Sequence, residues 1–93
     1  MLASFGGKNT RKIWECERVK GLTTKIQEMA RRKLRMLNNS QNLTDLQVPP
    51  SNRLEKLKGN LKKFYSIRIN NKLRIIFKWN NGNADEVEII NYH

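Results

Sequence analysis

The first half of the chain carries apolar side chains at helical spacing. From Ile26 onward, the positions i, i+3, i+4, i+7, i+8 and i+11 are apolar in five of six cases, and Lys33 is the exception. This period predicts an amphipathic helix that ends near Asn38. Thr24 is followed three residues later by Gln27, the spacing of a capping box, so the helix should begin there.

A shorter helix is expected ahead of the amphipathic one. Thr10 is a candidate N-cap for a helix to about Arg18, and Gly21 is a stop signal behind it. Residues 38–52 are polar and close with two prolines. They therefore predict a loop, with one helical turn around residues 43–46.

The second half of the chain changes to a period of two. Apolar and polar side chains alternate in FYSIRI (64–69), KLRIIFKW (72–79) and EVEII (86–90), and asparagine-rich turn signals separate these runs. Leu54 and Leu57 are candidates for a preceding strand. Helices followed by strands predict an α+β fold, in which two N-terminal helices pack on a small, mainly antiparallel sheet.

The length of the chain predicts one domain over residues 1–93. Its helical part should cover about 8–46 and its sheet part about 53–93. A start of MLASFGG without an apolar stretch does not resemble a secretion signal, and a single cysteine cannot form an internal disulfide. We therefore expect a cytoplasmic protein. No apolar run approaches the ~18 residues of a membrane span.

The first hairpin of the sheet constrains where two arginines lie. Directly opposed residues of an antiparallel pair point to the same face. A two-residue loop would place Ile67 against Arg74. A three-residue loop over Asn70–Lys72 instead pairs Ile67 with Ile75 and places Arg68 opposite Arg74, on the face away from the core.

Two arginines so opposed destabilise a sheet by a few tenths to ~1 kcal/mol. A phosphate bound between the two guanidinium groups compensates for this repulsion. The alternative is that both side chains splay into water. Because folding alone does not favour the pair, we prefer the phosphate.

The last strand can be placed by the same matching of faces. If Trp79 pairs with Val87, Arg74 pairs with Tyr92, and His93 comes close to the arginine pair. A register shifted by two residues keeps the same side chains on each face of the sheet, so it is equally compatible with the pattern. In the first register Tyr92 could stack on a base and His93 could transfer a proton; the alternative is a frayed terminus.

Charge is the most unusual bulk property of the chain. Nineteen Lys and Arg against eight Asp and Glu give a formal net charge of +11. This much like charge repels itself and favours a polyanionic partner. Nucleic acid is the first candidate, an acidic protein the second and an anionic membrane a distant third.

Basic and aromatic side chains are sufficient to cleave RNA. The 2′-OH attacks the adjacent phosphate, and the reaction needs a base, positive charge on the phosphorane and an acid for the leaving oxygen. One His and one Cys cannot make a zinc site, and no phosphate-binding glycine loop is present. Three acidic residues fall in one predicted strand: Asp85, Glu86 and Glu88. Their negative charge compensates part of the positive charge of the surface, and they do not resemble a Mg²⁺ site. We therefore expect no metal and no cofactor.

Several motifs together resemble the HigB family of bacterial toxins, in the RelE/ParE superfamily. These motifs are the run PPSNRLEKLKGNLKKFYSIRINNKLRIIFKW and the ending VEIINYH. Shorter segments earlier in the chain also agree with the pattern of this family: SF, RKL-ML and L-DL. The similarity therefore covers nearly the whole chain. The resemblance implies a RelE-like fold and a ribosome-dependent mRNA endonuclease acting on the 70S ribosome. It also implies neutralisation by a helix-turn-helix, HigA-like antitoxin.

Functional positions of that family carry over in part. The resemblance assigns catalytic roles to Lys58, Arg74, Tyr92 and His93. A position commonly occupied by His falls on Glu55, which becomes an alternative base.

Other positions depart from the pattern of many relatives. Asn91 stands where many have Asp, Leu73 where many have Trp, and Leu61 where many have Arg. The identity of the general base therefore stays open. Further phosphate contacts are expected from a set of basic side chains: Arg68, Lys56, Lys62, Lys63 and Lys72.

Two other functions compete with mRNA cleavage. A non-catalytic module that binds RNA or the ribosome would block translation without cutting mRNA. A gyrase poison of the ParE type would leave DNA breaks and would not need the terminal Tyr-His.

Overall fold

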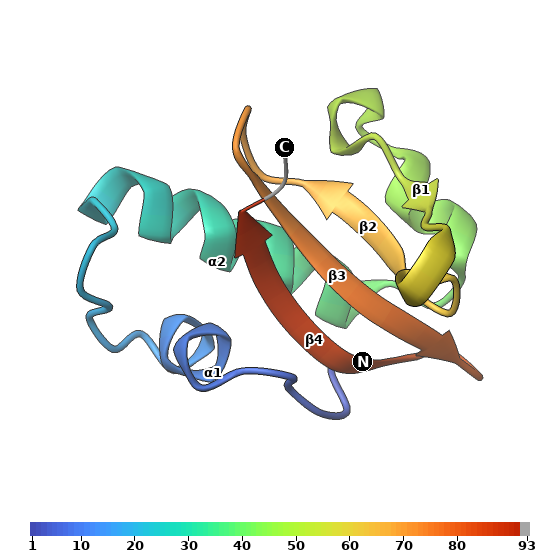
Figure 1. Ribbon diagram of the computed structural model, residues 1–93, viewed down its shortest axis with the longest axis horizontal. Helices are drawn as coiled ribbons and strands as arrows, with labels where there is room; N and C mark the ends of the chain where they lie inside the picture. Colours follow the sequence, from blue (N-terminus) through green and yellow to red (C-terminus); the bar gives the residue numbers. More distant parts are fainter. Residues whose placement is uncertain (92–93) are drawn as a thin grey trace.

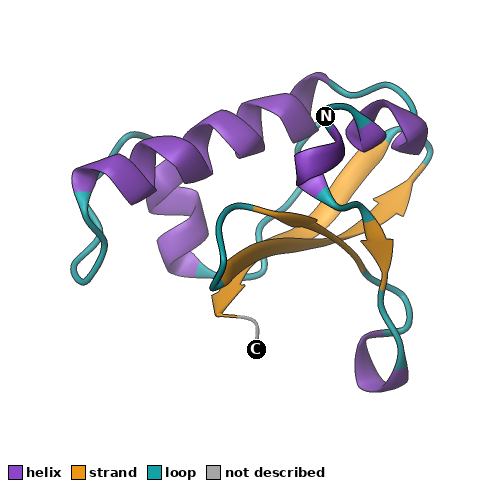
Figure 2. Cartoon of the chain, turned by 90° about the horizontal axis from the view of Figure 1, so that it is seen from above, coloured by secondary structure: helices purple, strands orange, loops and turns teal. Residues whose placement is uncertain are grey.

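A four-stranded antiparallel sheet with a long helix across one face forms the structure (Figures 1 and 2). The computed structural model describes residues 1–91. Its helices and strands are α1 (Lys8–Trp14), α2 (Thr24–Asn39), β1 (Glu55–Lys56), β2 (Tyr65–Arg68), β3 (Leu73–Asn80) and β4 (Asn83–Asn91). Short 3₁₀ turns are η1 (Leu43–Gln47), η2 (Pro50–Asn52) and η3 (Gly59–Leu61). The strands follow the order β1-β2-β3-β4, so the predicted α+β fold is confirmed.

The core lies between α2 and the sheet. Leu34 and Leu37 of α2 are fully buried, as are Ile67, Ile75 and Phe77 of β2 and β3. These side chains come from the predicted helical stripe and from the predicted alternating faces. The period-3.6 and period-two patterns therefore identified the two surfaces that pack together.

The start of α2 differs by one residue from the prediction. Thr23 is the N-cap, and its hydroxyl accepts a hydrogen bond from the Ile26 amide at 3.1 Å. Gln27 is buried instead of completing a capping box: its Oε1 accepts from the Val19 amide at 3.0 Å and its Nε2 donates to the Glu17 carbonyl at 2.6 Å. A single glutamine thus satisfies one amide and one carbonyl of the loop between the helices.

The first helix is shorter than predicted and begins earlier. Gly7 is its N-cap, and α1 ends at Trp14, where the prediction continued to Arg18. Cys16, with φ of 64°, turns the chain out of the helix in place of Gly21. Thr10 lies inside α1, buried, and its hydroxyl accepts a hydrogen bond from the Ile89 amide of β4 at 2.9 Å. The threonine therefore joins α1 to the sheet rather than capping the helix.

The first hairpin has the predicted register. Ile67 pairs with Ile75 and Arg68 pairs with Arg74. The turn between them is three residues long, since the Ile69 amide donates to the Leu73 carbonyl at 2.9 Å. Matching faces was sufficient here because no bulge interrupts this pair of strands.

The structure decides between the two registers that were open for the last strand. Ile89 pairs with Ile75 rather than with Phe77, and Arg74 pairs with Ile90 rather than Tyr92. This is the register shifted by two residues that face matching had left open. Two local features produce it, a tight turn and a bulge.

The turn joins Asn80 and Asn83 through Asn81 and Gly82, which both have positive φ, 50° and 82°. Such a two-residue Asn-Gly turn matches the twist of the strands. The register then shifts between Ile76 and Lys78, and Glu86 on the facing strand has φ of 51°. An extra residue of this kind is a β-bulge, which alternation of faces alone cannot locate.

The N-terminal residues protect the far edge of β4. Leu2 bridges to Ala84 and Phe5 to Val87, both in parallel orientation. The Leu2 amide also donates to the Asn38 side chain at 3.0 Å. An exposed strand edge favours aggregation, and this segment covers it. The sequence pattern had given no sign of this pairing.

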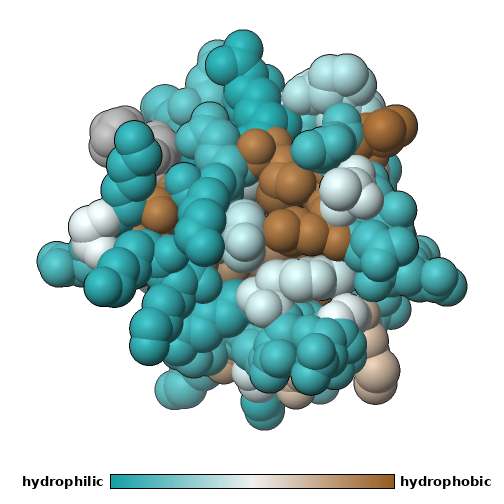
Figure 3. Space-filling view, turned by 90° about the vertical axis from the view of Figure 1, so that its right-hand side faces the viewer, coloured by the Kyte–Doolittle hydropathy of each residue, from teal (hydrophilic) through white to brown (hydrophobic). Residues whose placement is uncertain are grey.

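The surface is mainly hydrophilic on the face seen in Figure 3, where one hydrophobic patch lies among polar side chains. Among the helices of residues 1–91, none is long and apolar enough to span a bilayer.

One lysine lies buried in the interface between α2 and the following loop. Lys33 is 9% exposed, and its ammonium donates to Oδ1 of Asn52 at 2.6 Å. Burial lowers the pKa of Lys33 below its ordinary 10.5, and the neighbouring charge of Arg32 adds to this. Charged lysine in this place therefore costs free energy, which the hydrogen bond partly offsets.

The stability of the fold should depend on this lysine at alkaline pH. Because its folded pKa lies below that of the unfolded chain, the folded state binds fewer protons in the window just below 10.5. The free energy of unfolding should then rise with pH through that window. Urea unfolding of the parent and of Lys33→Met, at about pH 8 and about pH 10, measures this contribution. A Lys12→Met control, on the exposed face of α1, should keep the rise; an unchanged rise in Lys33→Met would contradict the assignment.

Candidate phosphate-binding site

The β2–β3 hairpin brings two arginines together on the sheet face away from α2. Arg68 and Arg74 are direct neighbours across the strands. The turn is fixed by Asn70, whose side-chain oxygen accepts from the amides of Lys72 and Leu73, each at 2.8 Å. Asparagine commonly closes turns in this way. The local sequence therefore sets the spacing of the arginine pair.

Arg74 is buried rather than solvated. Only 7% of the residue is exposed, although it points away from the core as predicted. Its Nε donates to the Ser66 hydroxyl at 2.9 Å and its Nη2 donates to the Arg53 carbonyl at 2.6 Å. Glu55 lies further off, with Oε1 at 3.9 Å from the same Nη2. An outward-facing arginine is usually solvated, but the chain after η2 lies against Arg74 and buries it.

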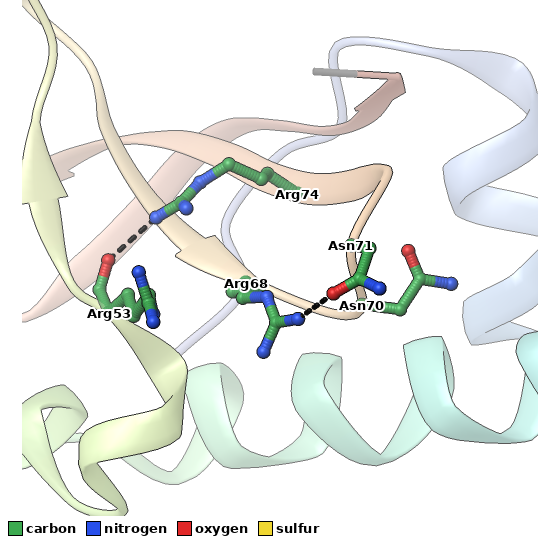
Figure 4. A pocket seen from close by; sticks show the side chains of 5 residues that line it. All are labelled: Arg53, Arg68, Asn70, Asn71 and Arg74. Atoms are coloured by element: carbon green, nitrogen blue, oxygen red, sulfur yellow. Dashed lines mark hydrogen bonds between the residues drawn. The ribbon is translucent and has the colours of Figure 1, made fainter. Parts of the chain in front are cut away.

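A hollow of about 280 Å³ opens beside this arginine (Figure 4). Three arginines and two asparagines line it: Arg53, Arg68, Arg74, Asn70 and Asn71. Arg68 is half-buried and donates to the Asn71 side chain. Among residues 1–91, no carboxylate lines this hollow, and guanidinium groups match phosphate oxygens in geometry and charge. The hollow therefore suits a phosphate group.

A second hollow of about 400 Å³ lies along β1 and the turn behind it. Glu55, Lys56 and Lys58 line it together with Leu57 and Leu61. Because Glu55 also approaches Arg74, this carboxylate lies between the two hollows. Lys58 is exposed and precedes η3. The structure thus places Glu55 next to the arginine cluster, and Lys58 in the hollow that Glu55 also lines.

Other predicted phosphate contacts are not among the residues that line the arginine hollow. The Lys56 ammonium lies over the Tyr65 ring, at 5.1 Å from its centroid, on the opposite face of the sheet edge. Lys62 and Lys63 are exposed after η3, and Lys72 is exposed in the hairpin turn. These four lysines add positive potential around the hollows. They do not line the hollow of the three arginines.

Tyr92 and His93 lie outside the described residues. The last described residue, Asn91, pairs with Leu73, one position before Arg74. Within residues 1–91, no group of three or more His, Cys, Asp or Glu side chains could hold a metal ion.

Sequence reasoning missed Arg53 and Ser66 as members of the site. Arg53 appears in the NRLE motif, but its part in the site depends on a left-handed backbone that arginine rarely adopts. Ser66 could have been found, because it faces the same side as Arg68 and Arg74 in the predicted register. It was overlooked because a serine on an outward face is usually solvated.

The fold places the chain in a structural class with chains of two solved complexes. In the YoeB–YefM complex from Staphylococcus aureus, one chain superposes with a TM-score of 0.64 at 18% identity, covering 100% of this chain and 98% of that one. A second structure, a heterotetrameric complex of YoeB–YefM from the same organism, gives 0.62 at 19% identity and the same coverage. Identities this low show a shared fold.

Sequence comparison gives the family itself. The family described as RelE-like toxin of type II toxin-antitoxin system HigB matches residues 3–93, and the chain belongs to it. Toxin HigB-1 of Vibrio cholerae is 44% identical over 63 residues, 68% of this chain and 66% of that protein. An uncharacterized protein of Haemophilus influenzae is 36% identical over 66 residues, 71% of this chain and 65% of that one. The chain thus spans just under two thirds of these relatives' lengths.

Proposed function

We propose that this chain is an endoribonuclease that cleaves mRNA in the decoding site of the 70S ribosome and so inhibits translation. In the proposed reaction the RNA 2′-OH attacks the adjacent phosphate, and the 5′-oxygen of the next nucleotide leaves. The observation that carries the proposal is the placement of Arg74. It is buried, held by two hydrogen bonds and set beside a hollow lined by two further arginines.

The charge that develops on the phosphorane is the part of the reaction that these arginines would stabilise. A guanidinium fixed by Ser66 and by the Arg53 carbonyl needs little reorganisation when that charge appears. Preorganised donors of this kind usually make the largest contribution to catalysis. Arg68, opposite Arg74, would bind a second phosphate oxygen.

Proton transfer would fall to residues around this cluster. His93 is the proposed acid or base, and Tyr92 would stack on or orient the substrate. Glu55 is the alternative base, since its carboxylate lies between the two hollows. Lys58 lines the second hollow and would add positive charge near the scissile phosphate. The proposed reaction uses no metal and no cofactor.

The proposed partners follow from charge and family. A net charge of +11 favours ribosomal RNA, and the basic face of α2 with Arg31, Arg32 and Arg35 would contact its phosphates. An antitoxin of the HigA-like helix-turn-helix type would neutralise the chain before it reaches ribosomes. Both partners would place the protein in the cytoplasm.

Mapping mRNA 5′ ends after brief expression tests this function. We expect new ends inside translated coding sequences, absent when translation initiation is blocked beforehand. Growth arrest with intact mRNA would favour a non-catalytic ribosome-binding inhibitor. DNA breaks without RNA cuts would favour a gyrase poison, and either result would overturn the proposal.

A further inference from the structure

Arg53 has an unusual backbone for an arginine. It follows η2 with φ of 46° and ψ of 56°, the left-handed region that residues other than glycine rarely adopt. Its amide donates to the Pro50 carbonyl at 3.0 Å. In this conformation its own carbonyl accepts from Nη2 of Arg74 at 2.6 Å. The strained residue therefore contacts the arginine at the centre of the proposed site.

A buried polar pair holds the residue before it. Asn52 is 0% exposed, and its Nδ2 donates to the Leu46 carbonyl at 3.1 Å. Its Oδ1 accepts from Nζ of Lys33 at 2.6 Å. Asn52 is thus joined both to α2 and to η1, through groups that water does not reach. Lys33 has no part in the proposed reaction, so its burial calls for another explanation.

The side chain of Arg53 has a different environment from its backbone. Its guanidinium lines the hollow together with Arg68 and Arg74 (Figure 4). With residues 1–91 this guanidinium makes no hydrogen bond or ion pair, whereas Arg74 is held on two sides. A strained backbone is kept where the surrounding structure enforces it, and such residues cluster at functional sites.

We propose that Arg53 is a third phosphate ligand for the RNA substrate, and that Lys33 and Asn52 are a positioning pair that sets it. The ligand, an RNA phosphodiester, rests on the proposed function. Arg68 and Arg74 hold the scissile phosphate between them, and Arg53 binds the neighbouring phosphate of the same strand. The Lys33–Asn52 pair acts only through the backbone of Arg53.

The variant Arg53→Gly separates binding from folding. Glycine adopts the left-handed conformation without strain, so the thermal midpoint should equal or exceed that of the parent. The probe is a short oligoribonucleotide with 2′-O-methyl groups, which binds but cannot be cut. Its affinity should fall about tenfold. The slope of log K against log salt should shrink by about 0.7, the value for one phosphate contact on a single strand.

Two further variants serve as controls for charge. Arg53→Lys keeps the positive charge but lacks the planar guanidinium group. Compared with Arg53→Gly, it should retain more of the parent's affinity and most of its salt slope. Lys12→Ala removes one charge from the exposed face of α1 and should leave both values close to the parent. An equal loss in Lys12→Ala would mean that Arg53 contributes only to the overall field.

The positioning pair is tested by a double-variant cycle. Lys33→Met should weaken binding of the probe, but should add nothing in a chain that already carries Arg53→Gly. Lys33→Gln, which can still donate to Asn52, should retain more affinity than Lys33→Met. Additive losses would overturn the positioning role, because Lys33 would then act independently of Arg53.

The outcome for Arg53 is separable from that for the proposed function. Probe binding without any cut in ribosome-bound mRNA would refute the nuclease and leave the ligand assignment to be decided by the Arg53 variants. A parent chain that does not bind the probe, or an Arg53→Gly chain that binds it with parental affinity and salt slope, would overturn the assignment.

Discussion

Arg74→Ala is expected to reduce the rate of mRNA cleavage on ribosomes by on the order of 10²-fold or more. The reason is the loss of a guanidinium that is already oriented before substrate arrives, by Ser66 at 2.9 Å and by the Arg53 carbonyl at 2.6 Å. Single-turnover cleavage with saturating ribosomes measures the effect on the chemical step. A parental rate would remove Arg74 from the mechanism.

The same substitution should also lower stability, because Arg74 is buried. Its removal leaves the Arg53 carbonyl without this donor, at a cost of about 1–3 kcal/mol. The rate must therefore be measured on protein shown to be folded by circular dichroism at the assay temperature. Ser66→Ala is the matched control, since it removes one hydrogen bond from Arg74 but keeps the charge. We expect Ser66→Ala to share part of the stability loss and to keep most of the activity.

His93→Ala is expected to reduce cleavage by about 10²- to 10⁴-fold, the usual contribution of a general acid or base. The thermal midpoint should stay close to that of the parent, since the proposed role is proton transfer alone. The pH dependence of the single-turnover rate gives the second measurement. In the parent, the plot of rate against pH should contain a rising or falling limb caused by ionisation of the imidazole. That limb should be absent in His93→Ala.

If the His93→Ala variant cleaves mRNA at the rate of the parent, the role in proton transfer would be assigned to Glu55 or Lys58 instead. Glu55→Gln then becomes the decisive variant, because glutamine keeps the shape of the side chain but cannot accept a proton. A joint fall of activity and thermal midpoint in His93→Ala would instead indicate a structural role for the imidazole.

The arginine pair could be predicted from the sequence because the hairpin has a regular register. Alternation fixed which side chains share a face, and the Asn70–Lys72 turn fixed the offset, so Arg68 was placed opposite Arg74. The C-terminal strand follows the same rules until Glu86, where a bulge moves the register. A bulge leaves no trace in the alternation of polar and apolar residues, so the sequence left two registers open for this strand.

The third arginine could not be predicted for a different reason. Whether Arg53 reaches the hollow depends on a buried network between Lys33 and Asn52, which are far apart in the sequence. In the helical pattern Lys33 was only an exception to an apolar stripe. Its partner was an asparagine in a loop, where asparagine is common and usually solvated. Tertiary contacts of this kind are not encoded in local periodicity.

The pairing of the N-terminal segment with β4 also constrains how the molecule folds. Leu2 and Phe5 bridge to Ala84 and Val87, so two segments far apart in the sequence must meet. Contacts with such large sequence separation form slowly and only after the intervening chain is available. Without β4, the sheet would lack its fourth strand and β3 would lack one of its two neighbours. The outer edge of the sheet is thus completed only when these two distant segments meet, a late event in folding.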